Sequence, residues 1–154
     1  MKNRLLLLVL ALTLMFPVAS LRAADPQPGA APAPKDDETE LGKTMSKLNG
    51  AWRKLRKQIA DPANNASSLE LVATVKAAAV QSLTLKPAKV EDVPAADREK
   101  FVADYQAQMK TFIATADQLE SALKANDNTG AQAIMQKMGG MQKEGHKEFK
   151  RPEH

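Results

Sequence analysis

Apolar side chains recur along residues 41–59 at alternating spacings of four and three. The series is Leu41, Met45, Leu48, Trp52, Leu55 and Ile59. In an α-helix, this heptad spacing brings every member of the series to one face. An apolar face of this length needs other helices to cover it. The pattern therefore predicts a helix that packs within a bundle.

Three further helices are predicted along the chain. Pro62 and the Asn64-Asn65 pair end the first helix, Ser67 with Glu70 forms a capping box for the second, and no segment shows the period-two alternation of a strand. The expected inward faces of the second, third and fourth helices are Val72, Val75, Ala79 and Leu83; Phe101, Tyr105, Met109, Phe112, Ala116, Leu119 and Leu123; and Met135, Met138, Gln142, His146 and Phe149.

Short, long and short connections join these helices, the long one covering residues 86–97. This order favours antiparallel neighbours, so the predicted fold is all-α: an antiparallel up-down-up-down four-helix bundle whose first and last helices are adjacent. Met45, near the start of the first helix, and His146, near the end of the last, then lie at the same end of the bundle. Taken singly, such a Met is usually a core residue and such a His usually complements the helix dipole. Together they are a pair that can ligate haem iron axially.

The Gly139-Gly140 pair falls inside the fourth helix. Each glycine costs about 1 kcal/mol relative to alanine within a helix. We therefore expect the helix that carries His146 to be interrupted and loosened at this pair.

The N-terminus has the features of a secretory signal. Lys2 and Arg4 precede an apolar run over residues 5–16, and small residues follow it. The run is too short for a membrane span. We expect cleavage after Ala23 or Ala24, with an uncleaved anchor as the alternative.

The chain is expected to have one folded domain behind this signal. Residues 1–24 are the predicted signal peptide, and residues 25–36 are rich in Pro, Ala and Gly, which is typical of a flexible linker. The four-helix domain is expected over residues 37–151, and residues 152–154 form a tail. This length suits a single domain.

Charge and composition exclude several classes of function. The chain without its first 24 residues has a net charge of about +1 and few aromatic residues, so no nucleic-acid partner is expected. It contains no Cys, which excludes thioether attachment of a haem, thiolate metal sites and a cysteine nucleophile. No carboxylate pair, Gly-rich phosphate loop or nucleophile motif appears, so we do not expect an enzyme.

Several segments resemble those of a known family. They are LGKTMSKLNGAWRKL around Met45, TVKAAAVQSL, AKVEDVP, QLESALKANDNTGAQA and GHKEFK. In this order, from about Leu41 to Lys150, the chain resembles the soluble cytochrome b562 family. The members of that family are periplasmic four-helix bundles that bind haem b without a covalent bond.

The resemblance implies a site and an activity. Met45 and His146 match the family's axial iron ligands, and Leu48, Trp52, Val75, Phe112 and Gln142 fall at or beside its haem-pocket positions. The implied protein is a periplasmic electron carrier with one non-covalent haem b per chain. Its partners would be unidentified periplasmic redox proteins. We expect a monomer with no membrane span after signal removal.

Two other functions fit parts of the pattern. A haem-free periplasmic bundle that acts as a stress-protective binder needs only the amphipathic helices, although the retained Met45 and His146 argue against it. A Cu(I) protein could use Met135, Met138 and Met141 with His146, because thioethers are soft ligands. Since a spacing of three spreads these methionines around the helix, core packing is the favoured interpretation of the run.

Overall fold

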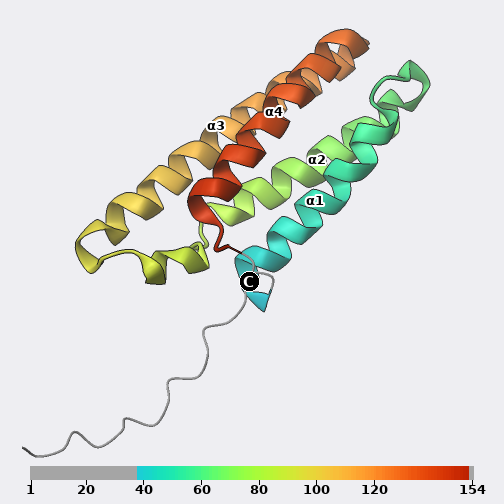
Figure 1. Ribbon diagram of the computed structural model, residues 1–154. Coiled ribbons are helices and arrows are strands. Elements are labelled where there is room, and N and C mark those ends of the chain that lie inside the picture. The colour runs from blue at the N-terminus through green and yellow to red at the C-terminus, as the bar shows by residue number, and fades with distance from the viewer. Residues whose placement is uncertain (1–37, 153–154) are drawn as a thin grey trace, which may run out of the picture. The chain divides into compact units, whose positions relative to one another are not determined.

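The computed structural model describes residues 38–152, which form an antiparallel bundle of four α-helices (Figure 1). The helices are α1 (Glu40–Gln58), α2 (Asn65–Ser82), α3 (Arg98–Lys124) and α4 (Asn128–Phe149). The predicted all-α four-helix bundle is confirmed. The predicted signal peptide and linker lie outside the described residues, and no helix within those residues is long and apolar enough to cross a membrane.

The heptad face of α1 is buried in the core from Leu48 to Ile59, whereas Leu41 and Met45, nearer the start of the helix, are half-buried. Leu55 is fully buried, Trp52 is 3% exposed, and Leu48 and Ile59 are almost as well covered. The Trp52 ring lies against Phe112 of α3, with ring centroids 6.3 Å apart. Burying one such aliphatic side chain contributes about 1.5–3 kcal/mol. The hydrophobic effect along this face therefore supplies much of the force that holds α1 in the bundle.

The second helix begins earlier than the capping box predicted. The α2 helix starts at Asn65, so Ser67 lies inside its first turn, where its hydroxyl donates to the Asn64 carbonyl at 3.0 Å. The predicted capping box is therefore wrong: a local side-chain to backbone bond replaces it.

The fourth helix is continuous through Gly139 and Gly140, contrary to the predicted interruption. A Cβ atom at either glycine would meet no neighbouring atom outside its own stretch of helix within 4 Å. No close neighbour therefore requires a glycine at either position. The Asp127 carboxylate starts the helix by accepting from the amide of Gly130 at 2.8 Å. Tertiary packing along the rest of α4 outweighs the poor helix propensity of two glycines.

Three asparagines close the end of the bundle where the two short connections meet. The Asn128 amide donates to the Ile59 carbonyl and to the Asn65 side chain, both at 2.8 Å. Asn65 in turn donates to Asn126 at 2.9 Å. Asn126 has φ of 57°, a backbone conformation that asparagine tolerates better than most residues. The network satisfies buried amides and ties the α1–α2 connection to the α3–α4 connection.

Candidate functional site

A cavity of about 650 Å³ opens at the other end of the bundle. Its wall is largely apolar and is built from α1, α3 and α4, with Pro87 and Ala88 from the long connection. α2 contributes no residue to this wall. Pockets for organic cofactors have volumes of about 300–1,000 Å³ and mostly apolar linings. The cavity has the size and character of a cofactor site.

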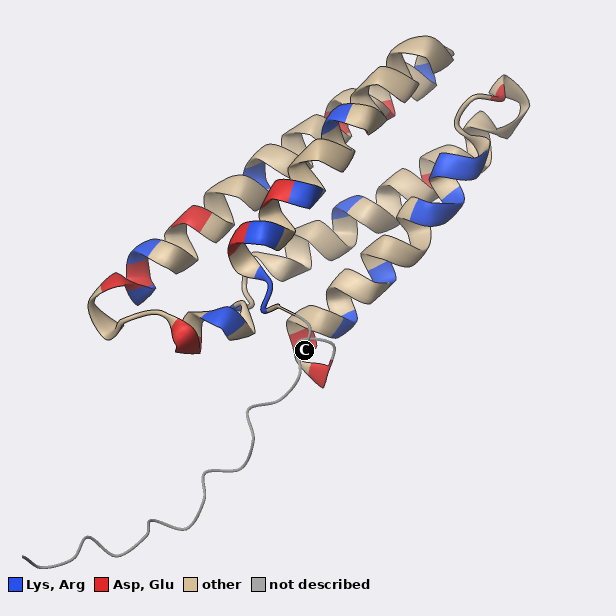
Figure 2. Ribbon diagram, in the orientation of Figure 1, with Lys and Arg blue, Asp and Glu red and all other residues tan. Residues whose placement is uncertain are grey.

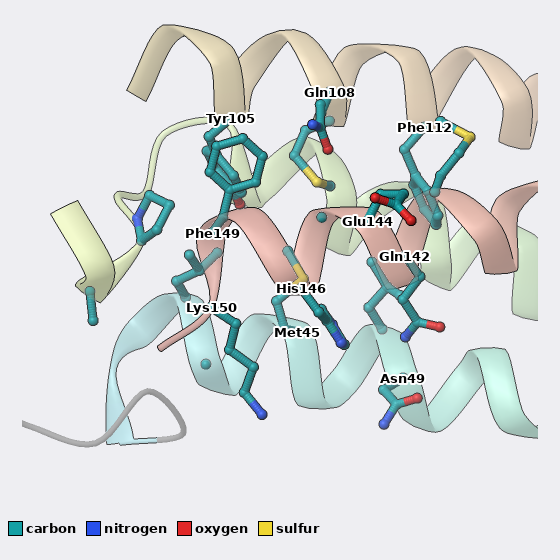
Figure 3. A pocket seen from close by; sticks show the side chains of 18 of the residues that line it. Met45, Asn49, Tyr105, Gln108, Phe112, Gln142, Glu144, His146, Phe149 and Lys150 are labelled. Atoms are coloured by element: carbon teal, nitrogen blue, oxygen red, sulfur yellow. The ribbon is translucent and has the colours of Figure 1, made fainter. Parts of the chain in front are cut away.

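Met45 reaches the cavity from the second turn of α1. The start of this helix is fixed by Thr39, whose hydroxyl oxygen accepts from the Gly42 amide at 2.9 Å. The Met45 side chain is half-buried and lies between α1 and α4 in Figure 3. Its thioether is the only sulfur ligand that α1 brings to the cavity.

His146 reaches the same cavity from near the end of α4 (Figure 3). The residue is exposed, and its backbone carbonyl accepts from the Lys150 amide at 3.1 Å, so the helix is still intact at this point. The structure thus brings together two residues that are about 100 positions apart in the sequence, at one end of the bundle.

An aromatic cluster anchors the last turn of α4. The Phe149 ring is 7% exposed and meets Phe101 and Tyr105 of α3 edge to face, with centroids 5.2 and 5.4 Å away. Tyr105 also lines the cavity, and its hydroxyl donates to the Ser82 carbonyl at 3.4 Å. Burial raises the pKa of Tyr105 above its usual value. A neutral, packed aromatic group therefore holds the backbone one turn beyond His146.

The long connection holds the end of α4 from the other side. Lys89, in the short helix η3 (Ala88–Asp92), donates to the backbone carbonyls of Lys147 and Glu148 at 3.3 and 2.7 Å. Arg151 pairs with Asp92 of the same short helix at 2.8 Å. Carbonyls in the last turn of a helix lack helical partners, and a cation near them is favourable. These contacts keep the final turns of α4, including His146, in register with the cavity.

Five of the seven predicted site residues line this cavity. They are Met45, His146, Leu48, Phe112 and Gln142. Trp52 and Val75 are absent from the wall: both are in the core, where Val75 is 1% exposed. Trp52 lies behind the wall, against Phe112. α2 is separated from the cavity by the packed core, which is why its Val75 cannot reach the lining.

Other lining residues had not been assigned to a site from the sequence. They include Asn49 of α1, Tyr105, Gln108 and Met109 of α3, and Glu144 and Phe149 of α4. For Tyr105, Met109 and Phe149, the apolar periodicity had marked the inward face, but periodicity does not separate core positions from cavity positions. Gln108 donates to the Glu148 carboxylate, which joins α3 to α4 at the rim.

The three methionines of the copper hypothesis differ in their surroundings. Met135 and Met138 are buried in the core, whereas Met141 is half-buried and lines the cavity. The Thr115 hydroxyl lies 3.7 Å from the Met141 sulfur. Within residues 38–152, no group of three or more His, Asp or Glu side chains gathers as a metal site either.

The cavity fits a haem by the chemistry of its donors. A thioether and an imidazole enter from α1 and α4, and the two form a known axial pair for haem iron. The exposed surface of the wall is largely apolar, which suits the faces of a porphyrin, and polar side chains such as Asn49, Gln142 and Glu144 lie among the apolar ones. With no cysteine in the chain, any haem would be held without a thioether bond.

One known protein family matches most of the chain. A model of the family described as Cytochrome b562 matches residues 40–150, from the first residue of α1 to the residue after α4. No curated protein and no solved structure matches the chain. The family match covers well over half of the chain and includes both residues of the donor pair. The chain therefore belongs to the cytochrome b562 family, whose members are four-helix bundles that bind haem b and carry electrons.

Proposed function

We propose that the protein is a periplasmic b-type cytochrome that transfers one electron at a time. Met45 and His146 would be the axial ligands of one haem b, held without a covalent bond. The observation that carries the proposal is the position of these two side chains, on different helices, in the wall of one apolar cavity.

Both donors act as neutral ligands. His146 must offer a deprotonated ring nitrogen, and Met45 offers a sulfur lone pair that favours Fe(II) over Fe(III). Because Met45 and His146 would both hold the iron, the bound group would supply electron transfer and not chemistry on oxygen or a bound substrate. When bound, the haem iron would supply one-electron chemistry between Fe(III) and Fe(II). The apolar lining from Leu48 and Phe112 disfavours added positive charge and would raise the reduction potential.

The surrounding contacts would limit the movement of Met45 and His146 between the two oxidation states. Phe149 and Lys89 fix the end of α4, and Thr39 fixes the start of α1. Ligands that move little between states allow fast electron exchange. We further propose that the protein is exported, because residues 1–24 have the pattern of a secretory signal, and that it acts as a monomer with periplasmic redox partners.

A haem titration of the mature protein tests this function. We expect one haem per chain, a low-spin visible spectrum in both oxidation states and a higher melting temperature with haem than without it. Met45→Leu keeps the volume but removes the sulfur, so it should retain haem and lose the low-spin spectrum. His146→Ala should lose both the spectrum and most of the affinity.

The matched control is Met138→Leu, which replaces a fully buried methionine outside the cavity. This variant should keep the wild-type spectrum. If wild type fails to bind haem stoichiometrically, the proposal is wrong and a haem-free bundle is left. A Cu(I) titration then tests the remaining alternative.

A further inference from the structure

The net positive charge of the domain lies on one helix. α1 contains six Lys and Arg residues but a single acid, Glu40. Figure 2 shows basic positions along the length of α1, whereas α3 carries both signs. Although the mature chain is nearly neutral, its charges are unevenly distributed between the helices.

Most of these cations have no carboxylate partner within residues 38–152. On α1, only Lys43 forms an ion pair there, with Glu40. Elsewhere in the domain, carboxylates pair with Lys76, Arg98, Lys100, Lys124 and Arg151. The other five basic residues of α1 are exposed. We call them the α1 basic face: Lys47, Arg53, Lys54, Arg56 and Lys57.

Helix stability accounts for only part of this face. Arg56 and Lys57 lie in the last turn of α1, where cations interact favourably with the helix dipole. That effect falls off within the last turn, so it does not explain Lys47, Arg53 or Lys54. Five like charges on one helix also repel one another. Their clustering therefore points to a role outside the fold.

The α1 basic face borders the mouth of the cavity. Ser46 and Asn49 line the cavity, and Arg53 and Arg56 continue the same row of the helix at spacings of four and three. A partner seated on this face would lie beside the cavity opening. Complementary charge raises the rate of encounter and fixes the orientation of two proteins.

We propose that the α1 basic face docks an acidic protein surface, that of the redox partner, beside the mouth of the cavity. Electron transfer between the haem and the docked partner rests on the proposed function, whereas docking on the α1 basic face does not require haem. A protein partner is favoured over a lipid surface because amphipathic helices that bind membranes expose Trp, Phe or Leu. The one large hydrophobic residue exposed in the described domain is Val80, at 52%, and it lies on α2.

The test uses a carboxylate-terminated monolayer on gold as the acidic surface. Adsorption of the mature protein, with and without haem, is measured by surface plasmon resonance at low ionic strength, and electron exchange of the haem form by voltammetry on the same surface. The variant is Lys47→Gln, Arg53→Gln and Lys54→Gln combined. The control combines Lys86→Gln, Lys110→Gln and Lys137→Gln, which remove the same charge from exposed positions on other elements.

We expect the α1 variant to lose about tenfold or more in adsorption affinity and the control to stay near wild type. Equal losses in both variants would overturn the proposal, because no face would then be preferred. The proposal would also be overturned if each adsorbed molecule of the α1 variant exchanged electrons as fast as wild type. Tighter binding of wild type to phosphatidylcholine–phosphatidylglycerol vesicles than to the monolayer would replace the protein partner with a lipid surface. If haem fails to bind but adsorption still depends on α1, the proposed function fails and the docking face stands.

Discussion

Replacing Phe149 should disturb the position of His146 while the four-helix bundle stays folded. Its ring is 7% exposed and packs edge to face on Phe101 and Tyr105, one turn after His146. Phe149→Ala deletes the ring and both contacts while leaving every cavity donor in place. The last turn of α4 then depends on Lys89 and on the backbone hydrogen bonds.

The magnitude follows from burial and contacts. A buried Phe→Ala change costs about 3–5 kcal/mol, of which two edge-to-face pairs account for about 1–3 kcal/mol. Phe149 lies at a helix end that can relax, so we expect about 3 kcal/mol. A domain of this size has a free energy of unfolding of about 5–15 kcal/mol, and the variant should remain folded. Haem binding must then reorder the last turn around His146, and each 1.4 kcal/mol of that cost lowers affinity about tenfold.

Urea unfolding of the haem-free protein measures the stability, and haem titration of the folded variant measures the affinity. The matched control is Leu123→Ala, which removes another buried core side chain, near the opposite end of α3. Both variants should lose similar stability, but only Phe149→Ala should lose about tenfold or more in haem affinity. Equal affinities for the two variants would refute the idea that the aromatic cluster positions His146.

Four other substitutions test the fold. Asn128→Ala removes an amide that donates to two buried acceptors, so it should lower the free energy of unfolding by about 2–4 kcal/mol in urea and leave haem affinity unchanged. Gly140→Ala should raise the free energy of unfolding by up to about 1 kcal/mol, because its Cβ meets no neighbour; Gly130→Ala, whose Cβ would overlap the N-cap carboxylate, should lower it, and the opposite order would contradict this reasoning. Hydrogen bonds from Lys124 and a second lysine lower the pKa of Glu120 from 4.5 to about 2. The stability that this carboxylate contributes is complete above pH 4.5 and is lost as the pH falls toward 2. Glu120→Gln should therefore flatten the acid-unfolding profile in that range, as followed by circular dichroism.

Much of the helical architecture could be predicted because helix periodicity is local. The spacing of Leu48, Trp52 and Leu55 fixes a common face of α1 whatever packs against it. The same reasoning placed Met45 and His146 at one end of the bundle, since connection lengths set the direction of each helix. The helix start at Asn65 and the unbroken passage through Gly140 escaped prediction, because competing hydrogen bonds and packing decided them.

By itself, the sequence determined which residues face inward and which two donors share an end of the bundle. Only the tertiary structure decided which inward residues line a cavity. Trp52 and Val75 fill the core, whereas Tyr105 reaches the wall, because the space that α1 and α4 leave open depends on how all four helices pack. The tertiary structure also brought Lys89 to the carbonyls at the end of α4. Such contacts join residues far apart in the chain, so no local pattern records them.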